Sequence, residues 1–416
     1  MTIAEHCLSE ISSNELISIA SDLVAIPSFK GEETPMAKHL CAWCSERGYS
    51  VEMDEVDPGR FQVVATLKGT GGGRSLMFNG HTDINSLTRG WTRDPWTAWV
   101  EGDKLFGHGV QNMKGGLACI MMAAEAVRRA KVPLSGDLML AFVVGETQGG
   151  EGMHHLMKRG VRTDMAVITE PFGSSNIATI HSGIVHFAIH VLGRSGHLSR
   201  RENTIHAVNK MTSVLNKLDQ IQFSCAPYPQ LPALPRLNVG SIIGGRGPEY
   251  LSEPPYIPDY CTIVVDVHFV PGQTVNDVIG DVRAVLEGIK ANDPDFVYEI
   301  EMPPPATIKG RRRLVMNPVD LPVDEEIVQV LSKSYTDVTG ERISHVGAVL
   351  PTSYSACDTS WLCEAGIPAV NYGPLTGFQS AGQEGAYAII SEMETVTKVL
   401  ALAACNICQP STPIAC

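Results

Sequence analysis

The chain has 416 residues, and its composition of 44% hydrophobic and 19% charged residues is typical of a globular protein large enough for two domains. A net charge of −13 argues against nucleic acid or an anionic membrane as a partner, because both carry negative charge themselves. No apolar run is long enough to cross a bilayer, no secretory signal is recognisable at the N-terminus, and 11 scattered cysteines favour a reducing cytoplasm.

Strands and helices alternate along the first part of the chain. Apolar residues at helical spacing predict helices, and continuous or alternating apolar runs predict strands. We therefore expect an α/β sheet with helices on both faces. The predicted helices are residues 14–26, 33–47, 114–130 and 152–159, and the predicted strands are residues 49–56, 60–67, 137–144 and 165–169, with a central strand that begins at Leu76.

The pattern changes near residue 186, where a smaller α+β unit of two helices on an antiparallel sheet is predicted. Its strands are residues 184–191, 236–244, 261–269 and 295–302, and its helices are residues 199–220 and 274–291. After three prolines the α/β pattern returns, with a helix at 324–340, a strand at 366–370 and a helix at 386–405. The sequence thus predicts a discontinuous α/β domain, residues 1–185 and 303–416, with residues 186–302 inserted into it.

The residues after Leu76 form the densest group of chemically active side chains. The central strand ends at a turn, and His81 and Asp83 follow at its carboxyl end, where open α/β sheets carry their sites. A His-x-Asp spacing lets the carboxylate orient an imidazole that binds a metal or a proton. Such a pair alone is weak evidence, but three tryptophans, a Gly-His-Gly and the run NMKGG at residues 112–116 follow it.

These motifs resemble those of the zinc amidohydrolases typified by acetylornithine deacetylase, succinyl-diaminopimelate desuccinylase and the aminoacylases. The family pattern is GHxD, a Trp/Pro segment and then G-R-G-x-x-D-M-K-G-G. The resemblance covers nearly the whole chain. It implies a catalytic α/β domain with a mixed sheet, an inserted lid or dimerisation domain, an amino-acid-like small-molecule substrate, and a homodimer formed through the inserted domain.

The resemblance assigns roles to four residues near strand ends. His81 and Glu170 match the two ligands of one zinc ion, and Asp83 matches the aspartate that orients the histidine. Glu146, in the segment GETQGG, matches the general base. A buried carboxylate with no cation beside it can act as a base or an acid near neutral pH, so Glu146 is also a candidate for metal-free proton transfer.

Three other positions of the family's metal site are changed. Asn112 replaces the aspartate that bridges two zinc ions, Thr147 replaces a ligand glutamate, and Ser380, on a looser alignment, replaces a late ligand histidine. An amide oxygen is a poor zinc ligand, and two strong ligands fall short of the usual three. The sequence therefore predicts either one weakly held zinc at His81 and Glu170 or no catalytic metal. Asn112, Thr147 and Ser380 are expected to contact substrate instead.

The inserted domain carries two further candidates. His197, in a G-x-x-x-H-x-S segment, matches a histidine that in the family reaches a neighbouring subunit's site and stabilises the oxyanion, although an ordinary loop histidine is the alternative. His268 stands where the family often has an arginine that holds a substrate carboxylate. We therefore expect a substrate other than a standard N-acyl amino acid. Asp358, in the α/β domain, also matches a family position near the site.

Three functions remain open from the sequence. The first is an amidohydrolase-like enzyme that deacylates, hydrolyses or transacylates an amino-acid-like small molecule. The second is a metal-independent lyase, cyclase or isomerase that uses Glu146 for proton transfer. The third is an inactive ligand-binding homologue, which the retention of Glu146, Asp83 and His197 argues against. Loss of metal ligands argues against ordinary hydrolysis, since a Lewis acid is missing, yet the lineage keeps hydrolase in first place.

Overall fold

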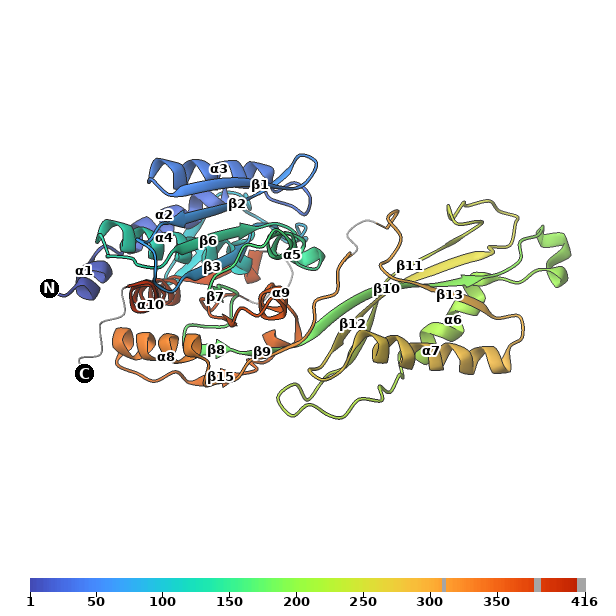
Figure 1. Cartoon of the computed structure of the whole chain (residues 1–416). Coiled ribbons are helices and arrows are strands. Elements are labelled where there is room, and N and C mark those ends of the chain that lie inside the picture. The colour runs from blue at the N-terminus through green and yellow to red at the C-terminus, as the bar shows by residue number, and fades with distance from the viewer. Residues whose placement is uncertain (309–311, 378–382, 410–416) are drawn as a thin grey trace. The chain divides into compact units, whose positions relative to one another are not determined.

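The computed structural model describes residues 1–308, 312–377 and 383–409 (Figure 1). The chain divides into two compact units. The first comprises Met1–Ile180, Val319–Ser353 and Cys357–Cys416, and the second comprises His181–Pro318 with Tyr354–Ala356. The first is an α/β unit with a large mixed sheet and the second carries a smaller antiparallel sheet, which confirms the predicted fold class. The lid or dimerisation role of the second unit stays a prediction.

The first unit is built on an eight-stranded sheet in the order β1-β2-β6-β3-β7-β16-β8-β15. The pairs β6–β3, β3–β7 and β7–β16 are parallel. The pairs β1–β2 and β2–β6 are antiparallel. All six residues of β3 are buried at the centre of the sheet. The strands are β1 (Ser50–Asp57), β2 (Arg60–Leu67), β3 (Leu76–His81), β6 (Leu138–Val143), β7 (Met165–Ile168), β8 (Asn176–Ala178), β15 (His345–Gly347) and β16 (Ala369–Asn371).

Helices cover both faces of this sheet, as the alternation of strands and helices predicted (Figure 1). Leu76 and Phe78 of β3 pack into a core with α4 and α10, while Met77 between them packs into a second core with α5 and α9. This division follows from the alternating direction of side chains along a strand. The helices are α1 (Ile3–Ser9), α2 (Ser13–Val24), α3 (Thr34–Glu46), α4 (Gly115–Arg129), α5 (Glu151–Lys158), α8 (Glu326–Thr339), α9 (Thr359–Glu364) and α10 (Ile390–Cys408).

The second unit has a four-stranded antiparallel sheet in the order β11-β12-β10-β13. Two helices, α6 (Ala207–Leu218) and α7 (Val275–Asn292), pack on the sheet through a separate apolar core. Alternate residues of β10, such as Phe187 and Ile189, lie in that core. The strands are β10 (Gly183–Leu192), β11 (Arg236–Gly245), β12 (Tyr260–Phe269) and β13 (Val297–Glu301).

Two predicted helices begin later than expected. The predicted helix at residues 199–220 starts as a short turn, Leu198–Asn203, and α6 begins only at Ala207. The predicted closing helix starts at Ile390, because β17 (Tyr387–Ile389) pairs first with β5 (Lys104–Phe106), which pairs with β4 (Trp99–Glu101). Strand pairing of this kind depends on residues far apart in the chain, so a local pattern does not reveal it. The remaining strands, β9 (Ile180–His181) and β14 (Val319–Asp320), have two residues each.

Within the described residues, no helix is both long enough and apolar enough to cross a membrane. The ten cysteines of the described part are all free thiols.

Candidate active site

Three acidic or basic side chains meet at the carboxyl ends of three adjacent strands. His81 ends β3, Glu146 follows β6, and Glu170 follows β7. Because these strands are parallel neighbours, their carboxyl ends lie at one edge of the sheet. One ligand atom from each of the three residues lies within 4.8 Å of the other two. The structure therefore brings together the predicted metal ligands and the predicted base.

The imidazole of His81 is buried and contacted on both ring nitrogens. Nδ1 lies 2.8 Å from the backbone oxygen of Asp83 and 3.5 Å from its carboxylate. Nε2 lies 2.7 Å from Oδ1 of Asn112 and 3.5 Å from a carboxylate oxygen of Glu170. Burial lowers the pKa of His81, but Asp83, Glu170 and Glu146 outweigh it and hold that pKa well above its ordinary value.

Asp83 connects the end of β3 to the loop that carries the predicted base. Its Oδ1 accepts the backbone N–H of Glu146 at 3.0 Å, and its Oδ2 accepts the backbone N–H of Thr147 at 3.1 Å. Oδ2 also accepts the Thr147 hydroxyl. Burial raises the pKa of Asp83, but the interactions with His81 and Thr147 lower that pKa by a larger amount, so that it lies below its ordinary value. The Thr147 hydroxyl is thus engaged inside the site, and its predicted contact with substrate stays a prediction.

Four buried carboxyl groups surround the one imidazole: Asp83, Glu146, Glu170 and Asp358. Burial raises the pKa of Glu170 to about 7, and the charges of Glu146 and Asp83 add to this while His81 opposes it. Burial also raises the pKa of Asp358 well above its ordinary value, and the charge of Glu146 raises it further. The cluster therefore carries an excess of acidic groups and favours a cation or a hydrogen-bond donor.

A buried arginine, Arg60, supports the loop after β6. It donates to Glu33 at 2.9 Å, to Glu151 at 2.6 Å and to Gln148 at 2.9 Å. These contacts hold the short helix Glu146–Gln148 between β2 and the start of α5. The sequence offers no signal for this network. Its members lie up to 118 residues apart in the chain, and only the fold brings them together.

Two other buried groups near the motifs were not assigned functions by sequence reasoning. Lys114 of the NMKGG run donates to the backbone oxygen of Ile26 at 2.7 Å, and burial lowers its pKa to about 7. Cys357 lies 2.6 Å from the Thr359 hydroxyl and 3.0 Å from Oδ1 of Asn371, and burial raises its pKa well above the ordinary value. A thiol of this kind is held in its neutral form and is a poor nucleophile.

The remaining predicted residues lie elsewhere. His197 and His268 belong to the second unit. His197 is exposed, and its Nδ1 accepts the backbone N–H of Ser199 at 3.2 Å. His268 lies on β12 with Nδ1 2.5 Å from the backbone oxygen of Tyr354. Ser380 lies outside the described residues. The oxyanion and substrate roles of these three residues stay predictions.

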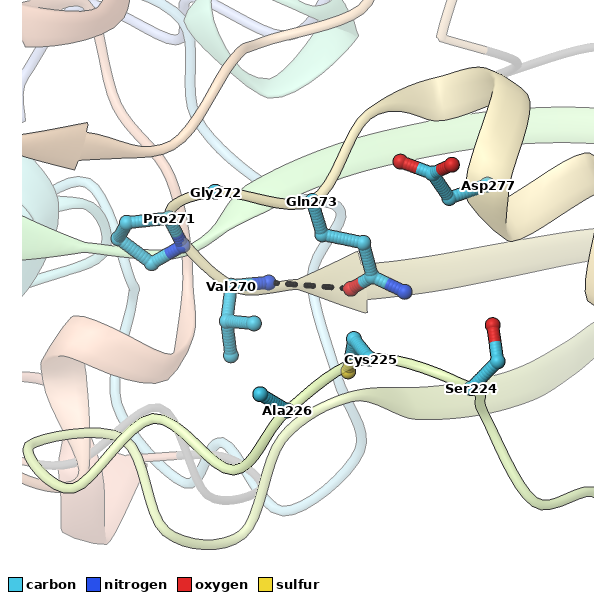
Figure 2. Close-up of a pocket in the computed structure, with 8 residues that line it drawn as sticks. All are labelled: Ser224, Cys225, Ala226, Val270, Pro271, Gly272, Gln273 and Asp277. Atoms are coloured by element: carbon cyan, nitrogen blue, oxygen red, sulfur yellow. Dashed lines mark hydrogen bonds between the residues drawn. The ribbon is translucent and has the colours of Figure 1, made fainter.

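A cavity of about 280 Å³ also opens in the second unit (Figure 2). Its polar groups serve the turn that leads into α7: Gln273 accepts the backbone N–H of Val270 at 3.4 Å, and Asp277 accepts the backbone N–H of Thr274 at 2.8 Å. The lining contains none of the predicted site residues, and we assign the cavity no role. The lining residues are Ser224, Cys225, Ala226, Val270, Pro271, Gly272, Gln273 and Asp277.

The fold and the cluster agree with a match to a known family. Residues 77–406 match the model of peptidase family M20/M25/M40. The chain belongs to this family. The match confirms the resemblance seen in the sequence. The family is one of peptidases and the relatives of the chain are named hydrolases, so the chain is a hydrolase.

Curated relatives of this M20 hydrolase match over most of their length. An N-formyl-4-amino-5-aminomethyl-2-methylpyrimidine deformylase from Halalkalibacterium halodurans is 29% identical over 96% of this chain and 96% of the relative. An acetylornithine deacetylase from Salmonella typhimurium is 30% identical over 76% of this chain and 81% of the relative. Among solved structures, the di-peptidase Dug1p from Saccharomyces cerevisiae matches with a TM-score of 0.77 at 13% identity, covering 99% of this chain and 100% of that one. This last similarity concerns the fold.

The M20 family is metal-dependent. A similar structure from Bacillus subtilis is described as a dinuclear metal-binding peptidase. It is 16% identical, with a TM-score of 0.65 over 95% of this chain and 98% of that one. In the present chain, His81 and Glu170 are donors for one ion, and a carboxylate oxygen of Glu146 lies within 4.8 Å of their donor atoms. The described residues offer no second set of three such donors. Asn112, which the resemblance matches to the bridging ligand, is neutral, and the hydroxyl of Thr147, matched to a ligand of the second ion, donates to Asp83.

Proposed function

We propose that this M20 hydrolase cleaves the amide bond of a small acylated amine, as a deformylase or deacylase, with Glu146 as the general base. The observation that carries the proposal is the meeting of His81, Glu146 and Glu170 within 4.8 Å at the ends of three parallel strands. The names of the relatives, a deformylase and a deacetylase, both describe the removal of a small acyl group and support the same reaction.

The chain's own residues supply proton transfer and orientation. Glu146 accepts a proton from the attacking water as the C–O bond forms, and returns a proton to the leaving nitrogen as the C–N bond breaks. Asp83 fixes the backbone of Glu146 and the ring of His81 through the hydrogen bonds described above. His81 and Glu170 would hold one ion, and that ion supplies Lewis-acid polarisation of the amide carbonyl when it is bound.

Metal-free proton transfer is the second candidate function. The oxygen of Asn112 lies 2.7 Å from Nε2 of His81, the ring nitrogen that also lies toward Glu170. This contact supports a site in which imidazole and carboxylates exchange protons without an ion, as in a lyase, cyclase or isomerase. An enzyme of that kind would need Glu146 but would keep its activity after metal removal.

The test is steady-state kinetics on a panel of N-formyl and N-acetyl amines with the wild type and Glu146→Gln. Glu364→Gln, at the end of α9 and outside the cluster, is the matched control. We expect Glu146→Gln to lower kcat by about 100-fold or more, since general base catalysis typically contributes 10²–10⁴-fold, and the control to retain its rate. Full activity of Glu146→Gln would refute the base assignment, and chelation without loss of activity would favour the metal-free alternative.

We further propose a homodimer formed through the second unit, in the cytoplasm. Support for the dimer comes from β11, a strand at the edge of the sheet whose Ile242 and Ile243 side chains are exposed. Support for the compartment comes from the free thiols. Light scattering on the purified chain tests the dimer, and Ile242→Asp should shift the mass toward that of a monomer.

A further inference from the structure

Asp358 is a buried acid whose partner is missing from the described polypeptide. Its side chain is 1% exposed, and neither carboxyl oxygen has a hydrogen-bond partner among the described residues. Buried polar groups in folded proteins are nearly always hydrogen-bonded, and leaving a buried carboxyl without a partner is costly. Two unpartnered oxygens on one buried side chain therefore point to a ligand that completes them.

The position of Asp358 is fixed beside the loop that carries the proposed base. Trp361 of α9 donates its Nε1–H to the backbone oxygen of Gly149 at 2.9 Å, which holds the start of α9 against that loop. A Cβ atom at Gly150 would lie 2.8 Å from Oδ1 of Asp358 and 2.5 Å from Nε1 of Trp361. Gly150, with a φ of +73°, therefore leaves the space in which these two side chains sit.

The surrounding charges define what kind of ligand fits. Asp83, Glu146 and Glu170 are buried in the same cluster and interact electrostatically with Asp358, whereas His81 is the one base among the five. Asp358 is not one of the three residues whose donor atoms lie within reach of a single ion. An N–H donor or an ammonium group on the ligand would supply the hydrogen bonds that both oxygens of Asp358 lack.

We propose that Asp358 binds the substrate, accepting hydrogen bonds from an amino or ammonium group on its amine portion, so that the enzyme selects amides that carry a second basic nitrogen. The inference rests on the proposed amide hydrolysis and narrows its substrate class. A hydrogen-bonded group of this kind discriminates strongly, because an analogue that lacks it leaves the acid buried and unpaired.

The test compares matched substrates. One set comprises monoformyl and monoacetyl diaminoalkanes with two to five carbons, and the other comprises the same acyl derivatives of monoamines of equal length. For the wild type we expect kcat/KM to be about 10- to 1,000-fold higher on the best diamine derivative than on its monoamine match. In Asp358→Asn that ratio should fall to within about threefold of one, through KM more than kcat, while Glu364→Gln keeps the wild-type ratio.

Direct binding and metal content separate the possible failures. The free diamine should bind the wild type in calorimetry at least about tenfold more tightly than it binds Asp358→Asn, whether or not any amide is cleaved. Cleavage of both sets at equal rates by the wild type overturns the inference and leaves the proposed function standing. No cleavage of any amide, with the diamine still bound through Asp358, overturns the proposed function alone. A loss of bound metal in Asp358→Asn would make Asp358 a metal ligand and overturn the inference. If Asp358→Asn fails to fold, the wild-type comparison still decides.

Discussion

Asp83 and Glu146 are joined by a hydrogen bond in which the backbone N–H of Glu146 donates to Oδ1 of Asp83 at 3.0 Å. The other oxygen of the same carboxylate accepts two donors from Thr147. The acid that orients His81 therefore also sets the position of the proposed base. Imidazole and base are thus contacted by one residue, the imidazole most closely by its backbone oxygen and the base by its carboxylate.

Asp83→Asn should lower kcat/KM by about 10- to 100-fold, because an amide offers one acceptor oxygen where the carboxylate offers two. The misplaced NH₂ group would face either the Glu146 or the Thr147 backbone donor. Steady-state kinetics and thermal unfolding measure the two effects. Asp324→Asn, which alters an exposed carboxylate, is the control. Equal activity of the two variants would show that Asp83 does not position the base.

Metal content should be at most about one ion per chain, since the described donors form one set of three. Elemental mass spectrometry on protein purified without chelator or affinity metal measures it. Glu170→Gln should lower the occupancy, because it removes an anionic ligand. Asn112→Asp should raise it, because a carboxylate would replace the neutral amide 2.7 Å from Nε2 of His81. Two ions in the wild type would contradict the single-ion interpretation.

Gly150→Ala should destabilise the fold by about 1–3 kcal/mol, because the added methyl group would overlap Trp361 and Asp358 at a positive φ. Gly160→Ala is the matched control, since Gly160 has a φ of +81° but no atom within 4 Å of its Cβ position. The control carries only the backbone strain, about 1 kcal/mol. Chemical denaturation measures the free energy of unfolding of both variants. Similar losses of unfolding free energy in the two variants would mean that Trp361 and Asp358 move aside at little cost.

His181 should make the stability depend on pH between about 4 and 6.5. Burial lowers the pKa of His181 to about 4, so the unfolded chain binds this proton first as the pH falls. Its contribution is therefore fully present above pH 6.5 and is lost progressively toward pH 4, by up to about 3 kcal/mol. His181→Leu should flatten this part of the curve of unfolding free energy against pH. Parallel curves for the variant and the wild type would show that His181 does not titrate in this range.

The sequence allowed the main architecture, and the place of several candidate side chains in it, to be predicted. The alternation of strands and helices placed β3 at the centre, and His81 and Asp83 at its carboxyl end. Adjacent parallel strands then bring Glu170 and Glu146 to the same edge, as the resemblance implied. These predictions succeed because they depend on local periodicity and on the general rule that parallel strands end together.

Other parts of the site depend on contacts that no local pattern encodes. The bonds of Thr147 to Asp83 and of Arg60 to Glu33 and Glu151 join distant segments, and neither can be read from spacing. The burial of Asp358 is likewise a result of how α9 packs on the loop after β6. Sequence reasoning placed Asp358 near the site but gave no measure of its isolation from hydrogen-bond donors.

The four buried carboxyls have a consequence beyond selection of a ligand. Their mutual repulsion opposes folding, and a bound cation of either kind, a metal ion or a basic substrate, relieves it. The folded population should therefore rise with the concentration of such ligands. We therefore expect this enzyme to persist longest when its substrate is abundant and to unfold more readily when the supply ends.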